Sequence, residues 1–140
     1  MASKEILKVE VFHYKLDSVS DEEFEKHIHE VLTPQWIGLV KRYNVLRYTS
    51  TFTPSTFAKE FGPVVDQMRP GWQMNEAHLT LTYYVRDFDE MKAIVADPDY
   101  QSRGRDTEAG WIDASKGQVK IGWETTYLED GKVVNTVAVE

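Results

Sequence analysis

The sequence contains no cysteine among its 140 residues, and it has only four histidines. Without cysteine there can be no disulfide, no thiolate nucleophile and no cysteine-ligated zinc site. The four histidines do not match an HExxH motif or a facial triad, so we expect no metal. Glycine-rich phosphate loops and the GxSxG elbow of serine hydrolases are missing as well. Any chemistry must therefore use His, Tyr and carboxylate side chains.

Basic charge and long apolar runs are also scarce. The formal net charge is −7, and no basic stripe of the kind that binds nucleic acid or anionic membranes is present. No apolar run approaches the roughly 18–20 residues needed to span a bilayer, and residues 1–5 show no apolar core of a secretory signal. We therefore expect one soluble domain over residues 1–140, in the cytoplasm, with no nucleic-acid or membrane partner.

What the sequence does contain is a regular succession of strand and helix patterns. Strands are expected at residues 6–15, 45–52, 77–85 and 118–128, and helices from Ser20 to about 39, at 54–68 and at 87–96. The first helix opens on the capping box Ser20-Asp21-Glu22-Glu23, and Pro34 predicts a kink or break within it. Residues 97–113 are polar and contain Pro and Gly, so a loop with at most one helical turn is expected. This order predicts an α+β fold, a ferredoxin-like βαββαβ sandwich with an extra helix after the second strand.

The segment 77–85 alternates strictly between two kinds of side chain. His78, Thr80, Thr82 and Tyr84 share one face, and the other face is apolar. The first strand carries aromatic side chains on both faces. A four-stranded sheet covered by helices on one side leaves its other face open, so we expect a second copy of the chain to cover it as a homodimer.

Several short segments of the sequence resemble one known family. They are Ser20–Phe24, Tyr43–Thr49, Ala96–Tyr100, Gly110–Asp113, Val119–Trp123 and Asp130–Val134. Together they are similar to the EthD-like dimeric α/β barrel family, and most of all to its fungal branch of polyketide-pathway decarboxylases of the atrochrysone carboxylic acid type. The resemblance implies a protomer that dimerises into a barrel, a pocket between sheet and helices, and no metal or organic cofactor. Two positions where that branch carries His differ here, at Leu32 and within residues 106–110.

The first candidates for catalysis lie on the predicted strands. His78 and Tyr84 share the polar face of 77–85, where a few donors in an apolar surround could act on a phenol or ketone. Strands 1 and 3 of such a sheet are neighbours, so His13 is expected on the same face as His78 if the register allows it. A structural His near a strand end is the competing interpretation for both.

Five further residues are candidates for binding the substrate. The resemblance places the second strand and the 110–113 loop near the cavity, and with them Tyr48 and Trp111. Arg47 could hold a carboxylate or enolate oxygen, His27 borders the apolar stripe of the first helix, and Asp113 could orient a His or serve as a base. Arg47 and Tyr48 are neighbours on a strand, so only one of them should point inward. Core packing for the aromatics, and a turn cap for Asp113, are the alternatives.

These observations predict a cofactor-independent enzyme that acts on an aromatic or polyketide small molecule through His and Tyr proton transfer. Decarboxylation, dehydration and cyclisation all fit that chemistry. Two alternatives stay open: a small-molecule-binding dimer without catalysis, and a cofactor-independent monooxygenase.

Overall fold

The structure is a computed structural model that describes residues 6–140; residues 1–5, on which the expectation about a signal segment rests, lie outside it. Its centre is a four-stranded antiparallel sheet made of β1 (Leu7–His13), β2 (Arg47–Phe52), β3 (Leu79–Val85) and β4 (Gln118–Trp123). The strand order is β2-β3-β1-β4, so the first and third strands are central neighbours. This is the order of a ferredoxin-like sheet, and the predicted fold class is confirmed.

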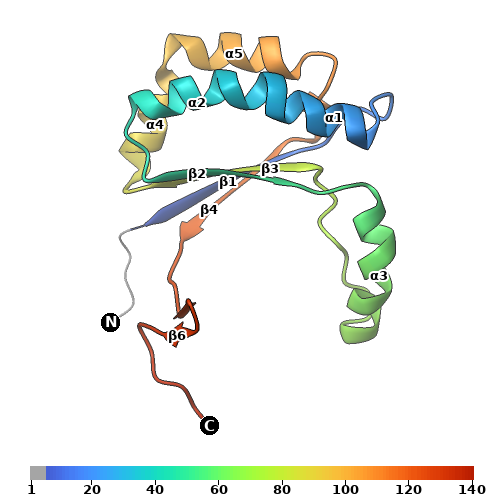
Figure 1. The fold of residues 1–140 in the computed structure, drawn as a ribbon, viewed down its shortest axis with the longest axis vertical. Helices are drawn as coiled ribbons and strands as arrows, with labels where there is room; N and C mark the ends of the chain where they lie inside the picture. The colour runs from blue at the N-terminus through green and yellow to red at the C-terminus, as the bar shows by residue number, and fades with distance from the viewer. Residues whose placement is uncertain (1–5) are drawn as a thin grey trace.

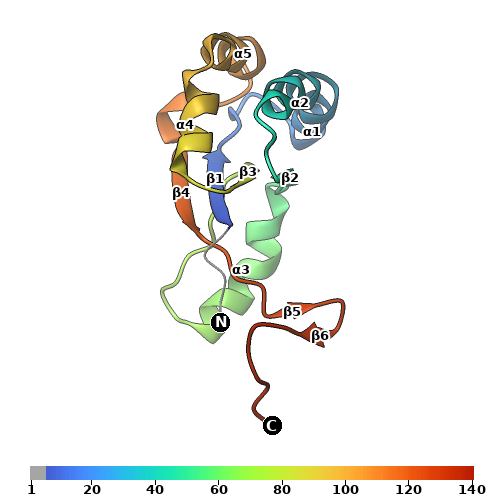
Figure 2. The ribbon, with the colours of Figure 1, turned by 90° about the vertical axis from the view of Figure 1, so that its left-hand side faces the viewer.

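Helices cover one face of this sheet. They are α1 (Asp21–His27), the π-helical turn η1 (Ile28–Leu32), α2 (Thr33–Arg42), α4 (Phe88–Ala96) and α5 (Pro98–Glu108), which lie together above the strands in Figure 1. The extra helix α3 (Thr56–Met68) and the small hairpin of β5 (Leu128–Glu129) and β6 (Lys132–Val133) extend below the sheet (Figure 2). A short 3-10 turn, η2 (Ala114–Lys116), precedes β4. Over residues 6–140, no helix is long and apolar enough to cross a bilayer.

The first helical segment starts as predicted and differs at Pro34. The Ser20 side chain accepts a hydrogen bond from the backbone N–H of Glu23 at 3.1 Å, which caps α1. The expected kink is instead a π-helical turn immediately before Pro34, closed by the Thr33 N–H on the Ile28 carbonyl. The helical path then continues to Arg42, so Pro34 changes the hydrogen-bond pattern without ending the helix.

The prediction of a loop over residues 97–113 was wrong, because residues 98–108 form the helix α5. Its start carries two standard signals: Asp97 caps the Asp99 N–H at 2.8 Å, and Pro98 occupies the first turn, where its missing N–H costs nothing. Few apolar side chains follow, so helical periodicity was absent from the pattern. The predicted last strand was also too long, since β4 ends at Trp123.

Strand register decides which side chains share a face. His13 pairs directly with Leu79, while Val9 and Val11 pair with Tyr83 and Leu81. Directly opposed residues of an antiparallel pair point the same way, so His13 lies on the helix-covered face with the leucines. His78 belongs to the opposite face, and the expectation that His13 and His78 share a face was wrong.

Large apolar side chains remain exposed outside the layer between the sheet and its covering helices. On α3 they include Phe57, Phe61, Val64 and Met68, and only Val65 of that helix is buried. On β4, Val119, Ile121 and Trp123 are also exposed, although they pair with β1 residues of the helix-covered face, of which Leu7 and Val9 are buried and Val11 is half-buried. One copy of the chain therefore leaves two apolar surfaces uncovered.

Candidate active site

Two titratable groups, His13 and Glu108, meet on the helix-covered face of the sheet. His13 is the last residue of β1, and Glu108 is the last residue of α5 above it. The His13 Nδ1 and Glu108 Oε1 atoms are 3.8 Å apart, and the two side chains are 14% and 30% exposed. The pair is therefore mostly shielded from water but still reachable from one side.

Burial shifts both groups of this pair toward their neutral forms. It lowers the pKa of His13 to about 4, and it raises the pKa of the Glu108 carboxyl above its ordinary value. A carboxyl whose pKa rises toward neutrality is a better proton acceptor and donor near neutral pH than an exposed one. His13 beside it is an uncharged imidazole over the same range.

Three phenols accompany the pair. Tyr100 on α5 lies beside Trp36, with ring centroids 5.2 Å apart, and Tyr48 packs on Tyr83 at 5.0 Å. Burial raises the pKa of all three tyrosines, and the Glu108 charge adds to the effect at Tyr100 and Tyr83. They therefore stay protonated and can donate hydrogen bonds. The buried Tyr48 hydroxyl makes no hydrogen bond of ordinary geometry within residues 6–140.

A cavity of about 370 Å³ opens beside this group of side chains. Trp36, Tyr100, Gly104, Glu108 and Ile112 are among the residues that line it. Its walls are mainly apolar, with the polar side chains of Glu108, Tyr100, Gln101 and Arg105 among them, and such a combination is typical of small-molecule sites. The cavity places a proton acceptor, a hydrogen-bond donor and aromatic rings around one space.

His27 and Trp111, both predicted to contact substrate, pack against each other beside the C-terminal end of α5. Their rings stack with centroids 3.9 Å apart and planes 6° apart. His27 is buried, and its Nε2 donates to the Thr107 carbonyl at 2.5 Å. A carbonyl can only accept, so this bond places a proton on Nε2. The structure thus gives His27 a structural contact with the end of α5.

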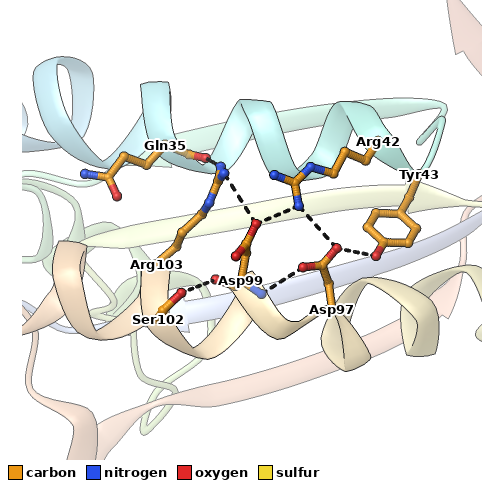
Figure 3. A network of polar contacts seen from close by, with 7 residues as sticks. All are labelled: Gln35, Arg42, Tyr43, Asp97, Asp99, Ser102 and Arg103. Atoms are coloured by element: carbon orange, nitrogen blue, oxygen red, sulfur yellow. Dashed lines mark hydrogen bonds and ion pairs between the residues drawn. The ribbon is translucent and has the colours of Figure 1, made fainter.

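The N-terminal half of α5 is attached to α2 by a polar network (Figure 3). Arg42 contacts Asp99 at 2.7 Å and Asp97 at 3.4 Å, and the Tyr43 hydroxyl donates to Asp97. Arg103 on α5 also donates to the Gln35 carbonyl of α2. These contacts hold α5 over the sheet at the end opposite to Glu108.

His78, the first predicted catalytic residue, lies in a different cavity. This cavity of about 270 Å³ is at the end of the sheet and is also lined by Tyr14, Glu76 and Lys116. The His78 Nδ1 accepts a hydrogen bond from the Lys15 backbone N–H at 3.2 Å. Burial lowers the pKa of His78, and the Lys15 charge acts in the same direction. His78 is thus a half-buried residue with one ring nitrogen occupied.

The structure does not bring Tyr84, Arg47 or Asp113 to either cavity. Tyr84 is six residues from His78 on the same face, which is roughly 20 Å along a strand. The Arg47 guanidinium lies 5.5 Å from the Tyr84 ring centroid, on the face opposite to Tyr48. Only Tyr48 of that pair points toward the helices, as predicted. Asp113 caps η2 by accepting from the Ser115 N–H at 3.0 Å, which matches its interpretation as a turn cap.

Glu108 and Tyr100 were not singled out by the sequence analysis. Both lie in the segment that was expected to be a loop, so their spacing on one helix was not recognised. The sequence does contain a signal for this helix, because Asp97-Pro98 is typical of a helix start. A helix that begins there places Tyr100, Gly104 and Glu108 on one face. Over residues 6–140, no group of three or more His, Asp or Glu side chains is placed to hold a metal ion.

Comparison with known proteins gives a family match, two similar relatives and one similar solved structure. The profile of the family described as EthD domain matches residues 16–115. Dehydratase iacD from Pestalotiopsis fici is 32% identical over 135 residues, which cover 96% of this chain and 97% of that protein. Decarboxylase claH from Passalora fulva is 24% identical over 126 residues, covering 89% and 79%. Among solved structures, a dimeric protein of ferredoxin-like fold from Bacteroides fragilis superposes with a TM-score of 0.57 at 13% identity, covering 86% of this chain and 97% of that one.

Proposed function

Because the chain belongs to the EthD domain family, we propose that it is a lyase that removes water or carbon dioxide from a cyclic, aromatic or polyketide-type small molecule by proton transfer. The family resemblance found in the sequence is thereby confirmed. The names of the fungal relatives, dehydratase and decarboxylase, support a lyase. The observation that carries the proposal is the contact of Glu108 with His13 beside a cavity that also contains Tyr100.

For dehydration the substrate is a β-hydroxy ketone bound in this cavity. Glu108 takes the proton from the carbon next to the carbonyl, and the electron pair moves to the carbonyl oxygen as an enolate. The Tyr100 hydroxyl donates a hydrogen bond to that oxygen where the charge develops. As the enolate collapses, the carbon–oxygen bond to the hydroxyl breaks and Glu108 returns its proton, so that water leaves.

Decarboxylation of a β-keto or ortho-hydroxy acid uses the same side chains. In a β-keto acid the carbon–carbon bond to the carboxylate breaks, its electron pair forms an enolate stabilised by Tyr100, and carbon dioxide leaves; a protonated Glu108 then delivers a proton to the carbon. In an ortho-hydroxy acid the protonated Glu108 first delivers its proton to the ring carbon that bears the carboxylate, and the electron pair of the breaking carbon–carbon bond then restores the aromatic ring as carbon dioxide leaves. Glu108 takes a new proton from solvent after each turnover. In both reactions His13 is the uncharged neighbour of Glu108, and Trp36 forms part of the wall against a flat ring.

This site retains His13 from the predicted catalytic residues and gives the acid/base role to Glu108 instead of His78. His78, just before β3, and Tyr84 near its other end are too far apart to act on one small molecule. Tyr48 and Trp111 stay close to the proposed site, as a buried donor and as support for the end of α5.

Two bicyclic substrates that give the same product test the proposal. Elimination of water from a β-hydroxytetralone and loss of carbon dioxide from a hydroxynaphthoic acid both yield a naphthol, which is followed by its fluorescence. We expect wild type to convert at least one probe. Glu108→Gln should reduce kcat by roughly a hundredfold to ten-thousandfold, as expected for loss of a general acid/base. Asp106→Asn removes an exposed carboxylate from the same helix and should leave kcat unchanged.

The same assay separates the alternatives. Full activity of Glu108→Gln together with an inactive His78→Gln would move the chemistry to the other cavity and overturn the assignment. Naphthol binding without turnover of either probe would favour the non-catalytic dimer. Consumption of dioxygen during turnover, measured with an oxygen electrode, would favour the monooxygenase.

We further propose that the protein works as a homodimer. The support is that α3 and β4 expose apolar side chains, such as Phe61 and Val119, which need a covering surface. A second copy of the chain presents two such surfaces itself, so a symmetric pair can cover both.

A further inference from the structure

The position of Glu108 needs an explanation, because it is the last residue of a helix. The final carbonyl groups of an α-helix have no partner within the helix, and such ends fray unless another group binds them. In α5 the Thr107 carbonyl is one of these groups, and the His27 Nε2–H donates to it at 2.5 Å. The turn that carries Glu108 is thus held by a buried side chain of α1.

The Thr107 side chain adds two more contacts at the same point. It is completely buried, with 0% exposure. Its hydroxyl donates to the Arg103 carbonyl at 2.7 Å and accepts from the Trp36 indole N–H at 3.2 Å. Thr107 therefore connects α1, α2 and α5 immediately before Glu108 in the chain.

Gly104 lies one helical turn before Glu108 and leaves room for its carboxylate. A Cβ atom at Gly104 would come within 3.0 Å of the Glu108 Oε2 atom. Glycine lowers the propensity of a helix interior, so its presence here needs a local reason. Without a side chain at 104, the carboxylate folds back along α5 with Oε2 against Gly104, while Oε1 faces His13.

We propose that Thr107 and Gly104 are positioning residues: Thr107 fixes the last turn of α5, and Gly104 lets the Glu108 carboxylate turn toward His13. Neither touches the reacting atoms in this scheme. The inference rests on the proposed function, in which Glu108 moves the proton. A displacement of about 1 Å at such a group is enough to slow a reaction strongly.

A pair of substitutions at Thr107 tests the first part. Thr107→Val keeps the shape but removes the hydroxyl, and we expect kcat on the naphthol-forming probe to fall roughly tenfold to a hundredfold while KM changes little. Thr107→Ser keeps the hydroxyl and should restore most of kcat. Exchange of the Trp36 indole proton, followed by NMR, should be faster in the Val variant only. Arg42→Gln loosens the opposite end of α5 and should leave kcat unchanged.

A pair of glycine substitutions tests the second part. Gly104→Ala and Gly62→Ala both replace a glycine in a helix interior, and a Cβ at Gly62 would meet nothing within 4 Å apart from its chain neighbours. Because Gly62 precedes Pro63, the gain in helix propensity is opposed by the clash of a Cβ with the proline ring, so Gly62→Ala should change the urea midpoint little and leave kcat unchanged. Gly104→Ala should lower kcat, and any change in its urea midpoint should be too small to account for the lower kcat. A merely structural role would lower stability and activity together.

The imidazole ¹⁵N signals of His13 supply a readout that needs no substrate. Glu108→Gln defines the signals of His13 without its charged neighbour, and Thr107→Val and Gly104→Ala should move His13 toward them. If both variants keep wild-type His13 signals and wild-type kcat, the positioning role is overturned even where Glu108→Gln is inactive. If the His13 signals move but Glu108→Gln is fully active, the positioning role stands and the proposed function fails.

Discussion

The buried neutral His13 makes the stability of the protein depend on pH in a defined window. Burial lowers its pKa from 6.5 to about 4 in the folded state, and an unfolded chain would restore the ordinary value. Between these values the unfolded state binds the proton and the folded state does not. The free energy of unfolding therefore falls as the pH falls from about 6.5 to 4, and below that range the effect no longer grows.

The expected size follows from the difference of about 2.5 between the two values. Each pKa unit corresponds to about 1.4 kcal/mol, so His13 should account for about 3 kcal/mol of stability lost between pH 7 and pH 4. That is a large share of the 5–15 kcal/mol typical of a domain. Urea denaturation of wild type and His13→Asn at a series of pH values measures it as the change in their difference.

His29→Asn is the matched control, because His29 is exposed on the helix surface. Its difference from wild type should stay nearly constant with pH. Glu108 is close enough to couple to His13, so the comparison is repeated in a Glu108→Gln background, where the same trend is expected. The free energy of unfolding of wild type and of His13→Asn could instead change in parallel from pH 7 to pH 4. That result would show that the folded protein does not hold His13 neutral, and the electrostatic argument for the site would fail.

Two further predictions concern the fold and the assembly. Ser20→Ala removes the cap of α1 and should lower the free energy of unfolding by about 1 kcal/mol in urea denaturation. Ser18→Ala in the preceding turn is the control and should have little effect. Equal losses of stability in the two variants would rule out the capping role of Ser20. Phe61→Glu places a charge on the exposed apolar face of α3 and should convert a dimer into a monomer in light scattering, while Lys59→Glu on the same helix should not; a wild-type protein that is already monomeric would contradict the proposed homodimer.

Much of the fold could be predicted from local patterns. Strict alternation in 77–85 identified the central strand β3, and the capping box at Ser20 marked the start of α1 within one residue. Both signals are local, because side-chain direction in a strand and hydrogen bonds at a helix start depend on adjacent residues. The helix α5 was missed because it has few apolar side chains: beside the Trp36–Tyr100 ring contact, it meets α2 through polar pairs such as Arg42 with Asp99, so the sequence shows no apolar periodicity.

The site was predictable only in part. His13, Tyr48, His27 and Trp111 were recognised as candidates, and all four lie on the helix-covered side of the sheet or support it. Glu108 was not, because a glutamate in a polar segment looks like any solvated residue. Its altered pKa and its contact with His13 come from packing between α5 and β1, which are 95 positions apart in the chain at these two residues.

The sequence by itself determined the class of protein: a cysteine-free α+β domain of the ferredoxin-like type, with His, Tyr and carboxylates as its available acids and bases. The tertiary structure decided which of them meet. The register of β1 against β3 put His13 and His78 on opposite faces, and the docking of α5 brought Glu108 to His13. Both outcomes depend on pairing between distant segments, where a shift of one residue reverses the face of every side chain in a strand.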